Sequence, residues 1–397
     1  MSAGTCSDRP ARAARHPDPR GAFHAHRAPG SHRRAALIGL LAGVALAGGC
    51  SPRIDGPDMP LALDIGTNRT VYAVTSRATG PDGSYGDGRS AGLGLLELTV
   101  SIPPNHRPGQ MTHHRNRADP QRDFVIARSL AYDDPAAFRA RIDRDLSGLP
   151  RDEREVSIFV HGYNATQSET AFRAAQIAED IRSPAVNAIY SWPSRGQLLG
   201  YVYDHDSMLF ARDGLETMLL AAGQSRAERI VLVGHSMGAL LTMEALRQIE
   251  IARPGWATEH VGGVILIAPD VDIDVFRAQV ARMKSLPQPF LIFVSDRDRA
   301  LSLSAFLRGK PAGERLGSLS NASRMADLPV TIIDTSDHSG DAASSHLVPV
   351  TSPTMIALLR RAVETSRTMG EDDAYFAVIP PAGRAVYGRL PEALDTR

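Results

Sequence analysis

A serine flanked by glycines occurs in the segment Gly234-His235-Ser236-Met237-Gly238. The segment fits the pattern G-x-S-x-G and lies between an aliphatic run, Ile230–Val233, and a stretch of helical periodicity over 238–250. A strand, a serine and a helix in this order are typical of a nucleophile elbow, whose sharp turn exposes the serine hydroxyl at the edge of a sheet. The two glycines remove side chains that would collide with the neighbouring strand and helix. The pattern predicts that Ser236 is a nucleophile, and a purely structural turn is the alternative.

A second glycine-containing turn lies upstream of the serine. The apolar run Val156–Val160 leads directly into His161-Gly162-Tyr163-Asn164. Attack on a carbonyl carbon places negative charge on the carbonyl oxygen, and preorganised backbone N–H groups are its usual stabilisers. The N–H of Met237 is one candidate for this oxyanion hole because it follows the nucleophile. We expect the N–H of Tyr163 to be the other, although a strand-ending glycine turn is the alternative for that segment.

A neutral serine is a weak nucleophile and needs a base that a third group orients. On a scaffold with this elbow the chain order is serine, acid, histidine. Three histidines follow Ser236, namely His260, His338 and His346. His260 precedes a predicted strand and therefore lies at the wrong end of the sheet. We expect His346, just before the last predicted helix, to be the base, with His338 as the alternative.

The acid is expected after a strand that follows the serine. The run Phe290–Val294 is followed by Ser295-Asp296-Arg297-Asp298. The usual spacing at this place is a small residue, two others and an aspartate, which selects Asp298. Asp296 fits only if the strand ends earlier, and Asp270, after the run Val264–Ile267, is a further alternative. Any of these aspartates could instead be a helix cap or a solvated loop residue.

The elements that must position these residues follow from the hydrophobic pattern. Two strand-like segments, Thr70–Ser76 and Leu95–Ile102, come first, with predicted loops over 79–94 and 103–123. From about residue 124, apolar runs alternate with stretches of helical periodicity. The expected strands are Val156–Val160, Ala188–Tyr190, Ile230–Val233, Val264–Ile267, Phe290–Val294 and Val330–Ile333, and the expected helices cover 134–147, 167–182, 206–222, 238–250, 272–283 and 353–366. This alternation indicates an α/β fold with a mostly parallel sheet and helices on both faces.

The N-terminal region has the pattern of an export signal. Residues 1–34 contain seven Arg and only two acids, and an uncharged apolar run over 35–49 ends at Cys50. A basic stretch, a short apolar core and small residues before a cleavage site describe such a signal, and the run is too short to span a bilayer. The sequence Leu46-Ala47-Gly48-Gly49-Cys50 resembles a bacterial lipobox, which implies that Cys50 is lipidated and becomes the mature N-terminus. An ordinary cleaved signal or an uncleaved anchor is the alternative.

We therefore expect four parts along the chain. Residues 1–50 are the export signal, 51–67 a tether whose residues 51–62 contain three Pro and a Gly, 68–368 the α/β domain, and 369–397 a C-terminal tail without clear periodicity. If Cys50 is lipidated, Cys6 is removed with the signal, so the mature protein forms no disulfide. The expected location is the cell envelope, with the protein anchored in the membrane by lipid and facing the periplasm or the exterior.

The composition limits the classes of partner and cofactor that the sequence supports. Lys+Arg and Asp+Glu balance at 44 each, and 43% of the residues are hydrophobic. A nucleic-acid partner would need a clustered basic excess, which is missing here. His113 and His114 are adjacent and lack the H-E-x-x-H spacing of a zinc site. The sequence thus predicts neither a metal nor an organic cofactor, and it does not indicate an oligomeric state.

Several of these motifs together resemble a family of bacterial α/β-hydrolases, the DUF900-type esterase/lipase family, many of them lipoproteins. The resemblance covers roughly residues 68–362 and rests on the HGYN and GHSMG motifs together with the segments 191–196 (SWPSRG), Tyr203-Asp204, 268–272 (APDVD) and 298–302 (DRALS). It implies the α/β-hydrolase fold and ester hydrolysis. We expect His161, Trp192 and His235 to contact the substrate; packing at the edge of the sheet is the alternative for Trp192.

The expected activity is cleavage of a carboxylic ester, of a small molecule or a lipid, by a Ser236–His346–Asp298 triad through an acyl-enzyme. Two other functions remain open from the sequence. One is an acyltransferase that uses the same triad with an alcohol acceptor, and the other is a non-catalytic envelope scaffold. Each predicted catalytic position holds a residue type that is competent for acyl transfer. This favours an enzyme over a non-catalytic scaffold.

Overall fold

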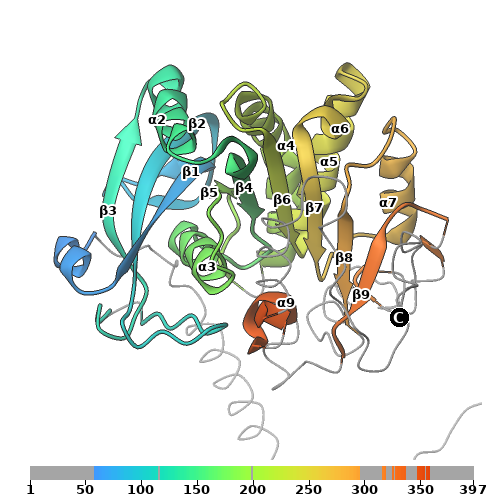
Figure 1. Cartoon of the computed structure of the whole chain (residues 1–397). Helices are drawn as coiled ribbons and strands as arrows, with labels where there is room; N and C mark the ends of the chain where they lie inside the picture. The colour runs from blue at the N-terminus through green and yellow to red at the C-terminus, as the bar shows by residue number, and fades with distance from the viewer. Residues whose placement is uncertain are drawn as a thin grey trace, which may run out of the picture. The chain divides into compact units, whose positions relative to one another are not determined.

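The computed structural model describes residues 58–114, 117–197, 200–295, 315–318, 324–325, 327–336, 347–353 and 355–357 (Figure 1). Several predicted features lie outside these residues. They are the export signal with Cys50, most of the tether, Asp296, Asp298, His338, His346 and the C-terminal tail.

A single sheet organises the described part of the chain, with the strand order β3-β2-β1-β5-β4-β6-β7-β8-β9. From β1 to β9 neighbouring strands are parallel, while β2 runs antiparallel to β1 and to β3. The sheet is therefore mostly parallel, as predicted. The strands are β1 Thr67–Thr79, β2 Tyr85–Ile102, β3 Val125–Tyr132, β4 Glu155–Val160, β5 Val186–Ser191, β6 Arg229–His235, β7 Val261–Ile267, β8 Phe290–Val294 and β9 Thr331–Asp334.

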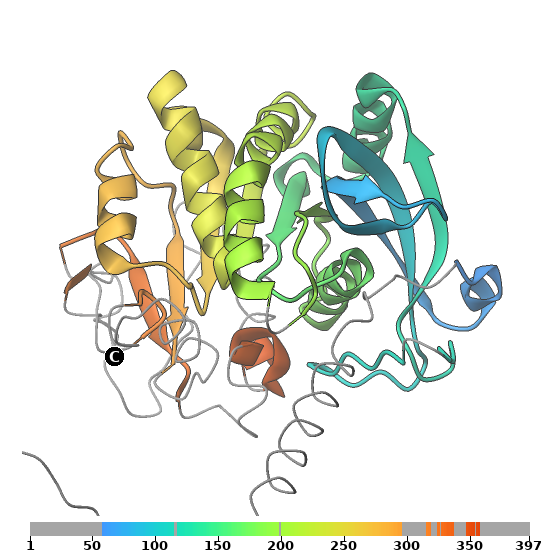
Figure 2. The ribbon, with the colours of Figure 1, turned by 180° about the vertical axis from the view of Figure 1, so that it is seen from behind.

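Helices cover both faces of the sheet, as the pattern indicated. They are α2 Pro135–Ser147, α3 Gln167–Asp180, α4 Tyr201–Ala222, α5 Met237–Ala252, α6 Trp256–His260, α7 Ile273–Val280 and α9 Val348–Thr351, with short 3-10 turns η1 Pro60–Asp64 and η2 Arg151–Glu153. One buried cluster joins the sheet to α2, α4, α5, α6 and α7. A second cluster joins the other face to α3 and α9 (Figures 1 and 2). The central strands are covered on both sides, which explains their continuous apolar runs.

The strand order indicates where on the sheet a ligand-binding site is expected. After β4 the chain adds β5 on one side of it and then β6 on the other. In open α/β sheets ligands bind outside the carboxyl ends of the strands where the strand order reverses in this way. The reversal lies between β4 and β6, which are the strands that precede the HGYN and GHSMG motifs. The topology therefore brings the two motifs to one edge of the sheet.

Helix α3 begins with a capping box formed by Thr166 and Glu169. The Thr166 hydroxyl accepts a hydrogen bond from the N–H of Glu169, and the Glu169 carboxylate accepts one from the N–H of Thr166. The cap satisfies two N–H groups that have no partner inside the helix. Only the six residues 161–166 separate the end of β4 from the start of α3, so this loop is short and its path is constrained.

The structure corrects the sequence-based boundaries in several places. The loop predicted over 79–94 is wrong from residue 85 onward, because β2 begins at Tyr85 and pairs with the end of β1. Strand β3 and helix α6 were missed, and α4 begins five residues before its predicted start. The tether is also shorter than 51–67: η1 packs on β3, and Ala62 is buried against Val125 and Ala127. Each of these segments is ordered by a partner distant in the sequence.

Candidate active site

Ser236 occupies the turn between β6 and α5 in the left-handed region of backbone conformation, with φ 53° and ψ −120°. Such a conformation costs a non-glycine residue about 1–3 kcal/mol and persists only where the surroundings hold it. Here its N–H donates to the carbonyl of Ile267 on β7 (2.9 Å), and its own carbonyl accepts from the N–H of Ala239 (3.0 Å). The strained serine between strand and helix is the geometry of a nucleophile elbow.

The two glycines of the motif are sterically required. A Cβ on Gly234 would lie 2.9 Å from the Cα of Ala239, and one on Gly238 would lie 2.3 Å from the carbonyl oxygen of His161 and 2.4 Å from that of Val160. Real Cβ atoms essentially never come so close to backbone atoms. Gly234 therefore lets α5 approach β6 closely, and Gly238 lets it approach the end of β4, as the elbow interpretation predicted.

The upstream turn lies directly against the serine. A Cβ on Gly162 would lie 2.9 Å from the Cβ of Ser236 and 2.8 Å from the Nδ1 of His235. Met237 is the first residue of α5, and the N–H groups of a first helical turn have no partner within the helix. The residues predicted for the oxyanion hole, Tyr163 and Met237, thus come from segments that meet at Ser236. The helix N-terminus adds a positive potential there.

Asp270 contacts the elbow from β7. Its N–H donates to the carbonyl of Ser236 (3.2 Å), while its carboxylate accepts from the hydroxyl of Tyr201 (2.6 Å) and pairs with the guanidinium of Arg315 (3.2 Å). Asp270 and Arg315 are both almost fully buried. Removing one partner of such a pair strongly destabilises a protein, because it leaves an uncompensated buried charge. Tyr201 and Arg315 were not singled out from the sequence.

Two of the three residues expected to contact substrate have almost no exposed surface. Trp192 is fully buried and its ring stacks on that of His161, with centroids 4.8 Å apart. The indole N–H donates to the carbonyl of His161 (2.8 Å), and the imidazole Nε2 lies 3.1 Å from the carbonyl of Trp192. Both rings pack under the HGYN turn, which is the alternative considered for Trp192, and contact of His161 or Trp192 with substrate stays a prediction. His235 is partly exposed beside Gly162.

Burial gives His161 an unusual titration. Loss of water around the ring, reinforced by the nearby charge of Arg77, lowers the pKa of His161 to about 3, against the opposing effect of the Gly162 and Trp192 carbonyls. The folded protein therefore keeps this ring neutral over the pH range in which an unfolded chain protonates it. The unfolded state binds the extra proton as the pH falls below about 6.5, so this group makes stability fall with falling pH.

We expect this titration to be measurable by urea denaturation of the wild type and of His161→Gln at pH 5, 6 and 7. The contribution of His161 to the free energy of unfolding should fall by about 2 kcal/mol from pH 7 to pH 5. His161→Gln loses the stacked ring and should be less stable at pH 7, but the gap to the wild type should narrow by that amount at pH 5. A gap that stays constant with pH would show that the folded protein protonates this ring like the unfolded chain.

A cavity of about 330 Å³ lies elsewhere in the molecule. It is bounded by α2, the C-terminal half of α4 and the sheet, and its walls include Tyr72, Phe138, Val156 and Met218. Val156 is at the start of β4, whereas the HGYN turn follows the end of that strand. The cavity is thus near the amino edge of the sheet and is separate from the site at Ser236.

The described residues contain no group of three or more His, Cys, Asp or Glu side chains that could hold a metal ion. None of the helices in this part of the chain is both long and apolar enough to span a bilayer.

Comparisons with known proteins agree with this fold. The family model for an α/β-hydrolase of unknown function (DUF900) matches residues 134–362, which is more than half of the 397 residues. No curated protein matches the chain.

Among solved structures, the product of gene lin2722 from Listeria innocua is 11% identical, with a TM-score of 0.35 over 56% of this chain and 97% of its own. The esterase PE8 is 15% identical, with a TM-score of 0.32 over 52% of this chain and 92% of its own. The family match, the parallel sheet and the elbow between β6 and α5 agree, and the chain belongs to the DUF900 family of α/β-hydrolases.

Proposed function

We propose that this chain is a serine hydrolase that cleaves carboxylic esters through an acyl-enzyme. One observation carries the proposal: Ser236 is held in a left-handed conformation at the β6–α5 turn, with Gly162 of the upstream turn packed against it. A strained serine at the N-terminus of a helix, next to a glycine turn from the neighbouring strand, is the arrangement that acyl transfer needs.

The proposed reaction has two halves. Asp298 orients His346, which takes the proton of Ser236 as the serine oxygen bonds to the ester carbonyl carbon. The N–H groups of Tyr163 and Met237 stabilise the oxyanion, and His346 then donates its proton to the leaving alcohol. Water attacks the acyl-enzyme in the second half, again with His346 as base, and releases the carboxylic acid and the free serine.

The described neighbours of the base and the acid support these assignments. Leu347, next to His346 in the chain, is packed against the buried cluster that contains Val233 and Ile267, the residues near the carboxyl ends of β6 and β7. Ser295 follows the end of β8, and three residues of chain span at most about 10 Å. In the chain, Asp298 is therefore four residues beyond the end of β8, and His346 directly precedes a residue that packs on this cluster.

Asp270 is the weaker candidate for the acid. Its carboxylate is bonded to Tyr201 and Arg315, and its N–H holds the carbonyl of Ser236. These contacts give it a role in shaping the elbow, and they leave Asp298 as the residue we assign to orient the base.

A panel of p-nitrophenyl esters, from acetyl to long acyl chains, tests this assignment with single variants. We expect His346→Ala and Asp298→Asn to lower kcat by about 10³-fold or more, because a triad acts as a unit. His338→Ala should be close to the wild type, and Asp270→Asn should mainly lower thermal stability. If His338→Ala or Asp270→Asn were instead the inactive variant, the triad would have to be reassigned to that residue.

We further propose that the protein is a lipoprotein of the cell envelope, anchored through Cys50. The support is the basic stretch and the short apolar run that end in the lipobox-like segment. Mass spectrometry of the mature N-terminus should find a diacylated Cys50, and Cys50→Ala should release the protein from the membrane fraction. An unmodified mature N-terminus at another position would refute the anchor but would leave the hydrolase proposal intact.

A further inference from the structure

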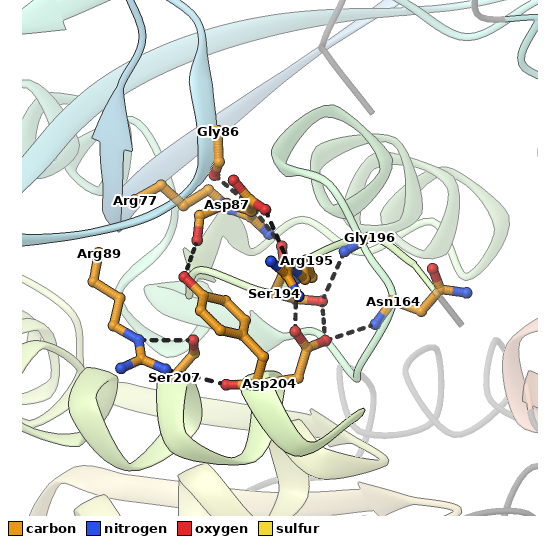
Figure 3. A network of polar contacts seen from close by, with 11 residues as sticks. Arg77, Gly86, Asp87, Arg89, Asn164, Ser194, Arg195, Gly196, Asp204 and Ser207 are labelled. Carbon is orange, nitrogen blue, oxygen red and sulfur yellow. Dashed lines mark hydrogen bonds and ion pairs between the residues drawn. The ribbon is translucent and has the colours of Figure 1, made fainter. Parts of the chain in front are cut away.

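A buried carboxylate lies in the first turn of α4, next to the proposed oxyanion loop. Asp204 has no exposed surface, and its two oxygens accept three hydrogen bonds (Figure 3). The donors are the hydroxyl of Ser194 (2.5 Å), the N–H of Arg195 (2.6 Å) and the N–H of Asn164 (3.3 Å). Burial raises the pKa of Asp204 above its usual value, and these donors together with the charge of Arg77 only partly oppose this rise. A carboxylate is costly to bury without hydrogen-bond donors, so the three donors show that the fold accommodates the Asp204 carboxylate specifically.

A buried arginine completes the network from the other side. Arg77, near the end of β1, is 3% exposed, and its guanidinium donates to four groups. These are the hydroxyl of Ser191 (2.8 Å) and the carbonyls of Gly86 (2.9 Å), Ser194 (3.0 Å) and Ala165 (2.8 Å). Figure 3 shows Arg77 and Asp204 approaching the 194–196 segment from different elements. The segment 191–196 (SWPSRG) therefore bridges the two buried charges.

The network holds two consecutive residues of the oxyanion loop. Asp204 binds the N–H of Asn164, Ser194 accepts from the N–H of Ala165 (3.3 Å), and Arg77 binds the carbonyl of Ala165. Asn164 has φ 61°, a left-handed conformation that is uncommon for a residue with a side chain. These hydrogen bonds hold the backbone on one side of Tyr163, while Gly162 is packed against Ser236 on the other.

The same turn of α4 also reaches the nucleophile. Tyr201, three residues before Asp204, donates to Asp270, whose N–H holds the carbonyl of Ser236. The rings of Tyr163 and Tyr201 are in edge contact, with centroids 5.5 Å apart. One helical turn therefore contacts the segment that carries the expected oxyanion donor directly and reaches the segment that carries the serine through Asp270.

We infer that Asp204, through Ser194 and Asn164, is a positioning residue that holds the oxyanion loop in its catalytic conformation, with Arg77 fixing the same loop from β1. The inference rests on the proposed hydrolase function. Preorganised N–H groups act on the charge that develops in the transition state, so a loosened loop should lower kcat more than it raises KM.

Asp204→Asn is the sharpest test, because it keeps the shape and replaces one acceptor oxygen with a donor. An amide can accept from Arg195 or from Asn164 but cannot accept from both. We expect kcat for a p-nitrophenyl ester to fall about 10- to 100-fold with KM changed by less than roughly threefold. Wild-type kcat in a folded Asp204→Asn protein, or a loss confined to KM, would overturn the inference.

Glu250→Gln is the matched control. Glu250 is also almost fully buried, and its carboxylate accepts from the N–H groups of Gly255, Ala257 and Lys284, at the far end of α5 from Ser236. The Glu250→Gln variant should lose thermal stability, as Asp204→Asn does, but should keep the wild-type kcat. A similar loss of kcat in Glu250→Gln would show that general destabilisation explains both variants, which would also overturn the inference.

Amide hydrogen exchange separates this inference from the proposed function. Peptides covering residues 161–166 should exchange faster in Asp204→Asn than in the wild type or in Glu250→Gln. Unchanged exchange would refute the positioning role whether or not the wild type turns over esters, and an inactive wild type with faster exchange would refute only the hydrolase function. If Asp204→Asn fails to fold, Ser194→Ala removes the shortest link of the network and should show the same pattern with about a 3- to 10-fold loss of kcat.

Discussion

Ser236→Ala is expected to lower ester hydrolysis by about 10⁴-fold or more while the protein remains folded. The serine oxygen forms the acyl bond, so nothing remains to attack the carbonyl carbon, and the residual rate reflects binding and the oxyanion hole alone. Alanine keeps the Cβ, and the backbone hydrogen bonds that hold the elbow to Ile267 and Ala239 do not involve the hydroxyl. The melting temperature should therefore change by no more than a few degrees.

A buried serine far from the elbow provides the control. Ser101, near the end of β2, is fully buried and donates to the carbonyl of Ala62 (2.9 Å). Ser101→Ala should lose about 1 kcal/mol of stability and keep full activity. Equal turnover by Ser236→Ala and the wild type on every ester of the panel would remove the serine-hydrolase proposal.

Gly238→Ala is expected to damage both stability and catalysis, although alanine is the better helix former. The new methyl group would lie 2.3–2.4 Å from two backbone oxygens at the end of β4. Either α5 or the β4 turn must move, at a cost of about 1–3 kcal/mol in the free energy of unfolding. The move also separates the N–H of Met237 from that of Tyr163, so kcat should fall by about 10²- to 10³-fold.

Gly263→Ala on the adjacent strand β7 is the matched control for this variant. Gly263 is buried too, but a Cβ there would meet only Pro289, at an ordinary distance of 3.7 Å. It should keep its activity and most of its stability in urea denaturation and ester assays. Gly238→Ala with wild-type kcat would mean that the close approach of α5 to β4 does not set the oxyanion geometry.

The elbow and the fold class could be predicted because their signals are local. Ile230–Val233, the glycines and the following helical periodicity lie within about twenty residues, and the steric reason for each glycine is set by its own turn. The Thr166–Glu169 capping box is local in the same way. Alternating apolar runs then suffice to indicate a mostly parallel sheet.

The corrections concern features that depend on contacts between distant residues. Residues 85–94 contain many Gly and Ser and read as a loop, yet they pair with β1, and Arg89 is bonded to Ser207 and Tyr203 on α4. The stacking of Trp192 on His161 likewise joins residues 31 positions apart, so the sequence alone does not show it. Asp204 carries no local sign of burial, because its donors come from β4 and β5 loops that meet in the fold.

The most direct test of the central claim is mass spectrometry after labelling with a fluorophosphonate, which reacts with activated serines. A single phosphonate adduct should be found on Ser236 of the wild type. Labelling should be much slower in His346→Ala and should stay fast in the His338→Ala control. No adduct on Ser236 of a folded wild-type protein, or an adduct only on another serine, would contradict the account.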